Sequence, residues 1–115
     1  MGTPCGITLQ NVAAEAGVSM KILEQKCDDQ ILLKLANFCV EWKLVGRHLK
    51  LTHAEITEVD GDNCREKLKR VGMLEKWKQK FAFNATYRVL VEALLALNNT
   101  SDALKCCIEI KSHFQ

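Results

Sequence analysis

Proline is scarce in this 115-residue chain, and no long uninterrupted run of apolar residues is present. One proline and six glycines leave no linker or low-complexity tract. The lack of any apolar run near the roughly 20 residues needed to cross a bilayer excludes a membrane-spanning helix. The start of the chain also lacks a charged region followed by an apolar one, so no secretory signal is recognised. We therefore expect a cytoplasmic protein with no membrane partner.

Sequence motifs for catalysis, metals and cofactors are also absent. The six cysteines include no Cys-x-x-Cys pair, so they do not predict a zinc site, and we interpret them as reduced thiols. The three histidines share no motif with a Ser or Cys partner, and there is no glycine-rich phosphate loop. We predict that the protein is not an enzyme and has no catalytic residue, metal site or cofactor.

The composition is that of an ordinary globular protein, with 48% hydrophobic and 26% charged residues. A chain of this length forms one domain that buries roughly two thirds of its unfolded surface. The net charge of +2 is too small to imply nucleic acid by itself. Any electrostatic function must therefore come from local clusters of charge.

The apolar residues recur at helical spacing and β-branched runs are short, which predicts an all-α fold. Thr52 and Glu55 form a capping-box pattern at the start of one helix, and Asp28 is placed to cap another. After an early helical segment, the predicted helices span 29–39, 41–50, 53–60, 63–81, 85–98 and 101–112.

The inward faces of these helices follow from the same periodicity. Trp42 and Trp77 lie on apolar sides and are expected to anchor the core rather than bind a partner. Leu68 is expected on the apolar side of the longest helix together with Trp77, and Ile108 is expected to point inward from the last helix.

An ordered set of motifs runs from Leu35 to Ile110. It comprises Trp42 followed by Val45-Gly46 and Leu49, then Leu51 with Glu55-Ile56, Leu74 with Trp77, and an Asn84-Ala85-Thr86 break followed by Leu90, Leu94 and Leu97. Together these motifs resemble a death domain. One departure is Gly46, where the family pattern has alanine.

The resemblance implies a six-helix antiparallel bundle of Greek-key arrangement. It also implies a homotypic interaction module that assembles signalling complexes with other death domains or with copies of itself. Residues 1–27 exceed what that fold needs. We predict that they form an N-terminal extension, helical and packed on the bundle, and that residues 28–115 form the death domain.

Charged clusters are the candidate interaction surfaces, because the family binds through small patches of opposite sign. A basic patch beside an acidic one permits head-to-tail stacking that does not close on itself. A third cluster lies on the longest helix, either as a solvated face or as a contact surface. The basic patch is Arg47, His48 and Lys50; the acidic patch is Glu55, Glu58, Asp60 and Asp62; the stripe on the longest helix is Arg65, Lys69, Lys76 and Lys80.

Nucleic-acid binding is the alternative hypothesis, because residues 8–19 look like the helix-turn-helix of lactose-repressor-type regulators. The recognition helix would then run from Ser19 to Cys27, supported by the basic longest helix. That segment carries Lys21 and Lys26 but no arginine to bind guanine or grip phosphate. Nucleic acid is therefore the less favoured partner.

Overall fold

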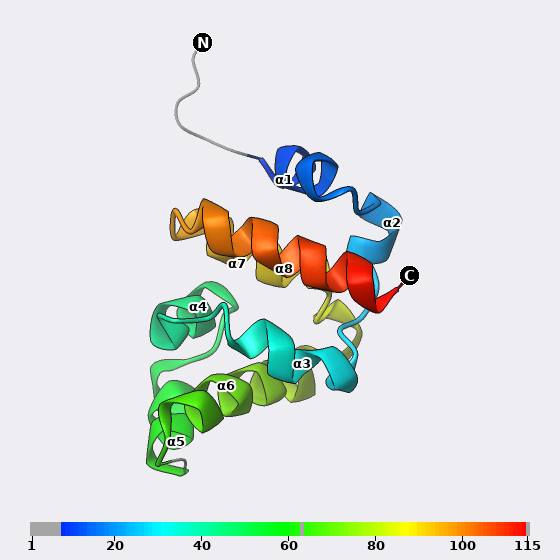
Figure 1. Ribbon diagram of the computed structural model, residues 1–115. Coiled ribbons are helices and arrows are strands. Elements are labelled where there is room, and N and C mark those ends of the chain that lie inside the picture. Colours follow the sequence, from blue (N-terminus) through cyan, green and yellow to red (C-terminus); the bar gives the residue numbers. More distant parts are fainter. Residues whose placement is uncertain (1–7, 63, 115) are drawn as a thin grey trace.

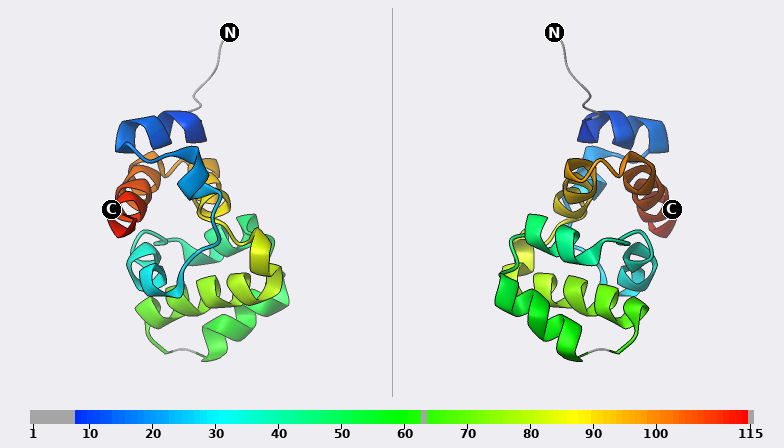
Figure 2. Two further views of the ribbon diagram at one scale, coloured as in Figure 1. Left: turned by 90° about the vertical axis from the view of Figure 1, so that its right-hand side faces the viewer. Right: turned by 90° about the vertical axis from the view of Figure 1, so that its left-hand side faces the viewer.

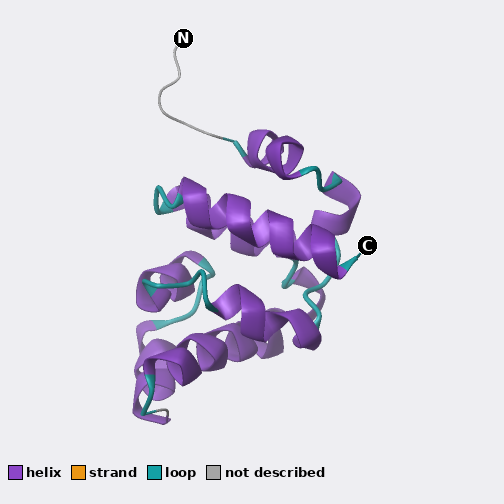
Figure 3. Cartoon of the chain, viewed as in Figure 1, coloured by secondary structure: helices purple, strands orange, loops and turns teal. Residues whose placement is uncertain are grey.

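The computed structural model describes residues 8–62 and 64–114. These residues form α-helices, one short 3-10 helix and no strand (Figure 3), which confirms the predicted all-α class. The parts of our predictions that concern residues 1–7, 63 and 115 lie outside the described residues. The helices are α1 (Leu9–Ala16), α2 (Met20–Leu23), α3 (Asp29–Ala36), α4 (Trp42–His48), α5 (His53–Asp62), α6 (Glu66–Phe81), α7 (Tyr87–Ala96) and α8 (Thr100–His113), with the 3-10 helix η1 (Ala82–Asn84) between α6 and α7.

The helix α6 lies at the centre of one half of the bundle, where α3, α4 and α5 all contact it (Figure 1). In the other half, α7 and α8 pack against each other. Contacts of α3 with α8 and of α4 with α7 join the halves. This arrangement places α4 and α5 side by side at one end of the molecule, where the predicted charged patches lie.

The N-terminal segment adds a layer to the α7–α8 pair. Figure 2 shows α1, in blue, lying across α7 and α8 on the side away from α5 and α6. Leu9, Val12 and Ala13 of α1 are buried, and Leu23 of α2, the helix that contacts α7, is fully buried. Residues 9–23 therefore contribute apolar side chains to the core that the bundle uses.

Main-chain hydrogen bonds fix this segment to the start of α7. The Cys27 N–H donates to the carbonyl oxygen of Ala85 at 2.9 Å, and the Tyr87 N–H donates to that of Gln25 at 3.2 Å. The Tyr87 hydroxyl in turn accepts from the Asp28 N–H at 2.9 Å. The junction between the extension and α3 is thereby held against the bundle.

Helix starts agree with the predicted capping residues. The Glu55 N–H donates to the Thr52 hydroxyl at 3.1 Å and the Thr52 N–H donates to the Glu55 carboxylate at 2.8 Å, which confirms the capping box of α5. Asp28 caps α3 by accepting from the Gln30 N–H. These caps set where α3 and α5 begin.

The core contains both tryptophans, as predicted, with Trp42 and Trp77 buried. At Gly46 a Cβ atom would lie 3.2 Å from Cγ of Met73 and 3.4 Å from Cδ1 of Ile56. Because alanine there would crowd these buried neighbours, the departure of Gly46 from the family pattern lets α4 approach α5 and α6 closely.

The predictions that Leu68 and Ile108 point inward were wrong, as was the expectation that Cys64 lies on the core-facing side of the longest helix. Leu68 is 47% exposed and Ile108 is 49% exposed. Each step of three residues turns a helix by about 300°, which is about 60° short of a full turn. Leu68 and Trp77 are separated by three such steps, so their side chains lie about 180° apart around α6. Similarly, Ile108 lies about 160° from the buried Cys106 on α8. The buried face of α6 is instead centred on Met73, Leu74 and Trp77.

Candidate protein-interaction surface

The basic patch lies at the exposed end of α4. Arg47 and His48 occupy its last turn, and Lys50 follows in a left-handed conformation with φ of 73°. The Leu51 N–H donates to the Gly46 carbonyl oxygen at 3.0 Å across this turn. All three basic side chains are exposed, and none of them has an ion-pair partner within residues 8–62 and 64–114.

The acidic patch on α5 faces the basic stripe on α6. This was not expected from the sequence, in which both were treated as outward surfaces. The Lys80 ammonium also donates to the main-chain carbonyl oxygen of Lys50, at 3.2 Å. The ion pairs that join α6 to α5 are Lys80 with Glu55 at 2.8 Å, Lys76 with Glu58, and Lys69 with Asp60 at 2.6 Å.

These contacts lower the pKa of two α5 carboxyl groups, those of Glu55 and Asp60. The hydrogen bond from Lys80, followed by that from the Thr52 N–H, lowers the pKa of Glu55 from 4.5 to about 2. The hydrogen bond from Lys69, followed by that from Lys43, lowers the pKa of Asp60. Most of the predicted acidic patch is therefore already engaged with cations of its own chain.

Two predicted site residues lie apart from these pairs. Asp62 ends α5 and Arg65 precedes α6, and both side chains are exposed. Neither forms an ion pair with another residue in the described parts of the chain. Among the predicted site residues that have no ion pair in the described parts of the chain, Arg47, Lys50 and Arg65 are cationic and Asp62 is anionic.

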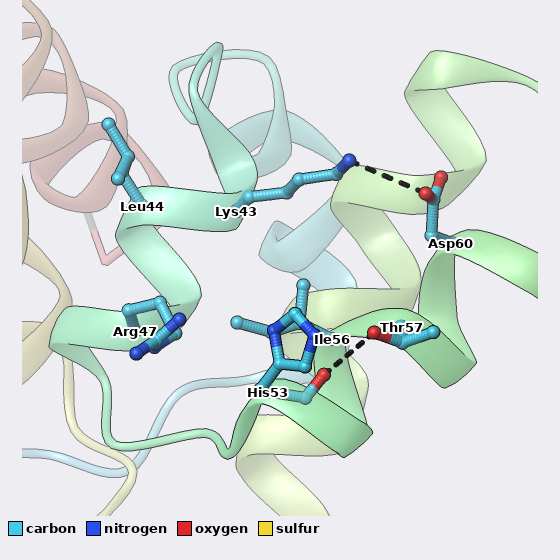
Figure 4. A pocket seen from close by; sticks show the side chains of 7 residues that line it. All are labelled: Lys43, Leu44, Arg47, His53, Ile56, Thr57 and Asp60. Atoms are coloured by element: carbon cyan, nitrogen blue, oxygen red, sulfur yellow. Dashed lines mark hydrogen bonds and ion pairs between the residues drawn. The ribbon is translucent and has the colours of Figure 1, made fainter.

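A pocket of about 220 Å³ opens between α4 and α5 beside the basic patch (Figure 4). Lys43 reaches across its edge to Asp60 at 3.4 Å. The Thr57 hydroxyl donates to the His53 carbonyl oxygen at 2.9 Å on the α5 side. The pocket is lined by Lys43, Leu44, Arg47, His53, Ile56, Thr57 and Asp60. The sequence does not predict this pocket, because its walls come from two helices whose separation depends on packing around Gly46.

Comparison with known proteins identifies one family for this fold. The family model described as Death domain matches residues 27–107. The chain belongs to the death domain family. No curated protein and no solved structure matches it.

The helix-turn-helix hypothesis fits this death domain poorly. Gly17, with φ of 77°, makes the predicted turn, but α2 ends after one turn at Leu23 instead of continuing to Cys27. Leu23 is buried in the bundle, and Lys26 pairs with Thr86 through a main-chain bridge. A recognition helix lies in the major groove and contacts base edges, whereas α2 is a single turn that packs against α7.

Most of the cysteine thiols of this death domain that the structure describes are buried. Within the described residues Cys27, Cys39, Cys106 and Cys107 are free and buried, whereas Cys64 is free and exposed. Burial raises the pKa of Cys27 and of Cys39 to about 12, so these thiols stay protonated. In the same residues no cluster of metal ligands is found, and no helix is long and apolar enough to span a membrane.

Proposed function

We propose that this death domain binds a different death domain through the basic end of α4 and thereby builds a cytoplasmic signalling complex. Its family consists of protein-interaction modules rather than enzymes. The observation that carries the proposal is the contrast between two sets of basic residues. Arg47, His48 and Lys50 are exposed and have no ion-pair partner within the described residues, whereas Lys69, Lys76 and Lys80 of α6 are paired with α5.

The same contrast supports an acidic partner over a second copy. Head-to-tail stacking of identical chains needs an accessible acidic patch to meet the basic one. In this chain three of the four predicted acidic residues already pair with lysines, so they have less free charge to offer a second copy. A death domain with unpaired carboxylates on its surface offers more.

Charge of this kind acts mainly on association. Complementary potentials steer the encounter and suppress wrong partners, and added salt screens them over about 8–10 Å. The complex should therefore form faster and more tightly at low ionic strength. A role in apoptotic or innate immune signalling follows from the family and belongs to this proposal.

Assembly state tests the proposal directly. We would measure light scattering of this chain alone, and mixed with purified death domains of different surface charge, over a range of salt concentrations. The proposal expects a monomer alone and a salt-sensitive complex with an acidic death domain. An increase in particle size for this chain alone would show self-assembly instead. A size change on addition of a DNA duplex would favour nucleic-acid binding.

A further inference from the structure

We propose that the pocket between α4 and α5 receives one apolar side chain from an acidic helix of the partner death domain. This inference rests on the proposed function and names the chemistry of the partner at that site.

The size of the pocket fits a single side chain. Its volume of about 220 Å³ lies below the roughly 300–1,000 Å³ of pockets that enclose a small-molecule ligand. Leu44 and Ile56 provide apolar walls, and Leu44 remains 49% exposed although Trp42 and Val45 of the same helix are buried. Covering Leu44 with a leucine-sized or phenylalanine-sized side chain would remove apolar surface from water on both partners.

The charge around the pocket selects an acidic segment. Lys43 and Arg47 are the cations that line it, and its one carboxylate, Asp60, is held by Lys43 and by Lys69. The Arg47 guanidinium has no ion-pair partner among the described residues, and its planar fork suits a bidentate bond to a carboxylate. A partner helix with a glutamate or aspartate beside an apolar residue satisfies both features.

Two exposed apolar residues of a second copy are poor occupants for the same reason. Phe83 is its most exposed large apolar side chain among the described residues, at 84%, but the Lys26 ammonium lies over the ring, 5.4 Å from its centroid. Leu68 is flanked in sequence by Lys67 and Lys69. Either residue would bring cations toward the cations of the pocket, and such like-charge contacts oppose binding.

Binding of peptides to the full chain tests whether the pocket selects an apolar side chain flanked by carboxylates. The probe is a helical peptide with one leucine between glutamates; its controls replace the leucine with alanine or the glutamates with lysines. Methyl NMR of the protein reports where each binds. We expect the leucine peptide to shift the signals of Leu44 and Ile56, the alanine peptide to bind about tenfold or more weakly, and the lysine peptide not to bind. Equal binding of the leucine and alanine peptides, or shifts elsewhere, would overturn the inference, as would the same shifts caused by self-association.

Variants separate this inference from the proposed function. Leu44→Ala removes an apolar wall and Thr57→Trp fills the pocket; Leu33→Ala, at a 56% exposed leucine of α3, is the matched control. We expect the first two to weaken binding of the partner death domain about tenfold and the control to leave it unchanged. If only Arg47→Glu weakens binding, the pocket inference fails and the proposed function stands. If Arg47→Glu also leaves binding unchanged, both fail.

Discussion

Replacing Leu23 with alanine should destabilise the whole domain, although Leu23 precedes the residues that match the family. This side chain is fully buried in the core where α2 contacts α7. Its loss leaves a cavity among packed neighbours, and Leu→Ala changes at such sites cost about 2–5 kcal/mol. Total stabilities of domains are about 5–15 kcal/mol, so the variant should lose a large fraction of its stability.

The assay is thermal unfolding followed by far-UV circular dichroism, with urea unfolding as a second measure. At about 4 °C per kcal/mol for a domain of this size, the expected fall in Tm is about 8–20 °C. The matched control is Leu33→Ala, at an exposed leucine, which should change stability by about 0.5 kcal/mol or less. If Leu23→Ala changed Tm no more than Leu33→Ala, the extension would not fold as one unit with the bundle, and our account of α1 and α2 would be refuted.

Three further outcomes are expected. Gly46→Ala should change stability by no more than about 1 kcal/mol in urea unfolding, because the gain in helix propensity offsets crowding of Met73, whereas Gly46→Leu should destabilise by more. Glu55 has a folded-state pKa of about 2, below its ordinary 4.5, so its stabilising contribution is complete above pH 4.5 and is lost as the pH falls toward 2; Glu55→Gln should flatten the pH dependence of Tm in that range. In a Cys5→Ser background, a thiol reagent should label Cys64 quickly and the buried Cys106 only after unfolding.

The helices could be predicted from the sequence because their signals are local. The capping pair Thr52 and Glu55, the cap Asp28 and the two core tryptophans each depend on residues within one or two turns. The turn at Gly17 is local as well. The length of α2 is not local, because this helix ends where the chain turns away to bond with the start of α7.

The candidate site could be predicted only in part. The composition of each charged patch is readable from the sequence, but whether a patch is available depends on which helices face each other. Lys76 and Glu58 are 18 residues apart and pair only because α5 packs along α6. The pocket likewise requires α4 and α5 to be brought together around Gly46. Such contacts depend on tertiary packing and leave no periodic pattern in the sequence.

The domain boundary between residues 27 and 28 stays a prediction, which the cooperativity of unfolding can test. The family match begins at Cys27, and α3 begins at Asp29. Yet the Cys27 N–H is bonded to Ala85, and the extension shares the bundle's core. We therefore propose that residues 8–26, which precede the family match, form a layer that folds together with the death domain.

The central claim is that Arg47 at the end of α4 is available for a partner, while Glu55, Glu58 and Asp60 of α5 are held by lysines of α6. Its most direct test compares two single charge reversals, Arg47→Glu and Glu58→Lys, by the Kd of each for the acidic death domain that binds the wild-type chain. Since Arg47 is unpaired among the described residues and Glu58 is held by Lys76, Arg47→Glu should raise the Kd at least about tenfold and Glu58→Lys less than about threefold. An equal or larger loss of affinity with Glu58→Lys would contradict the account and place the binding surface on α5.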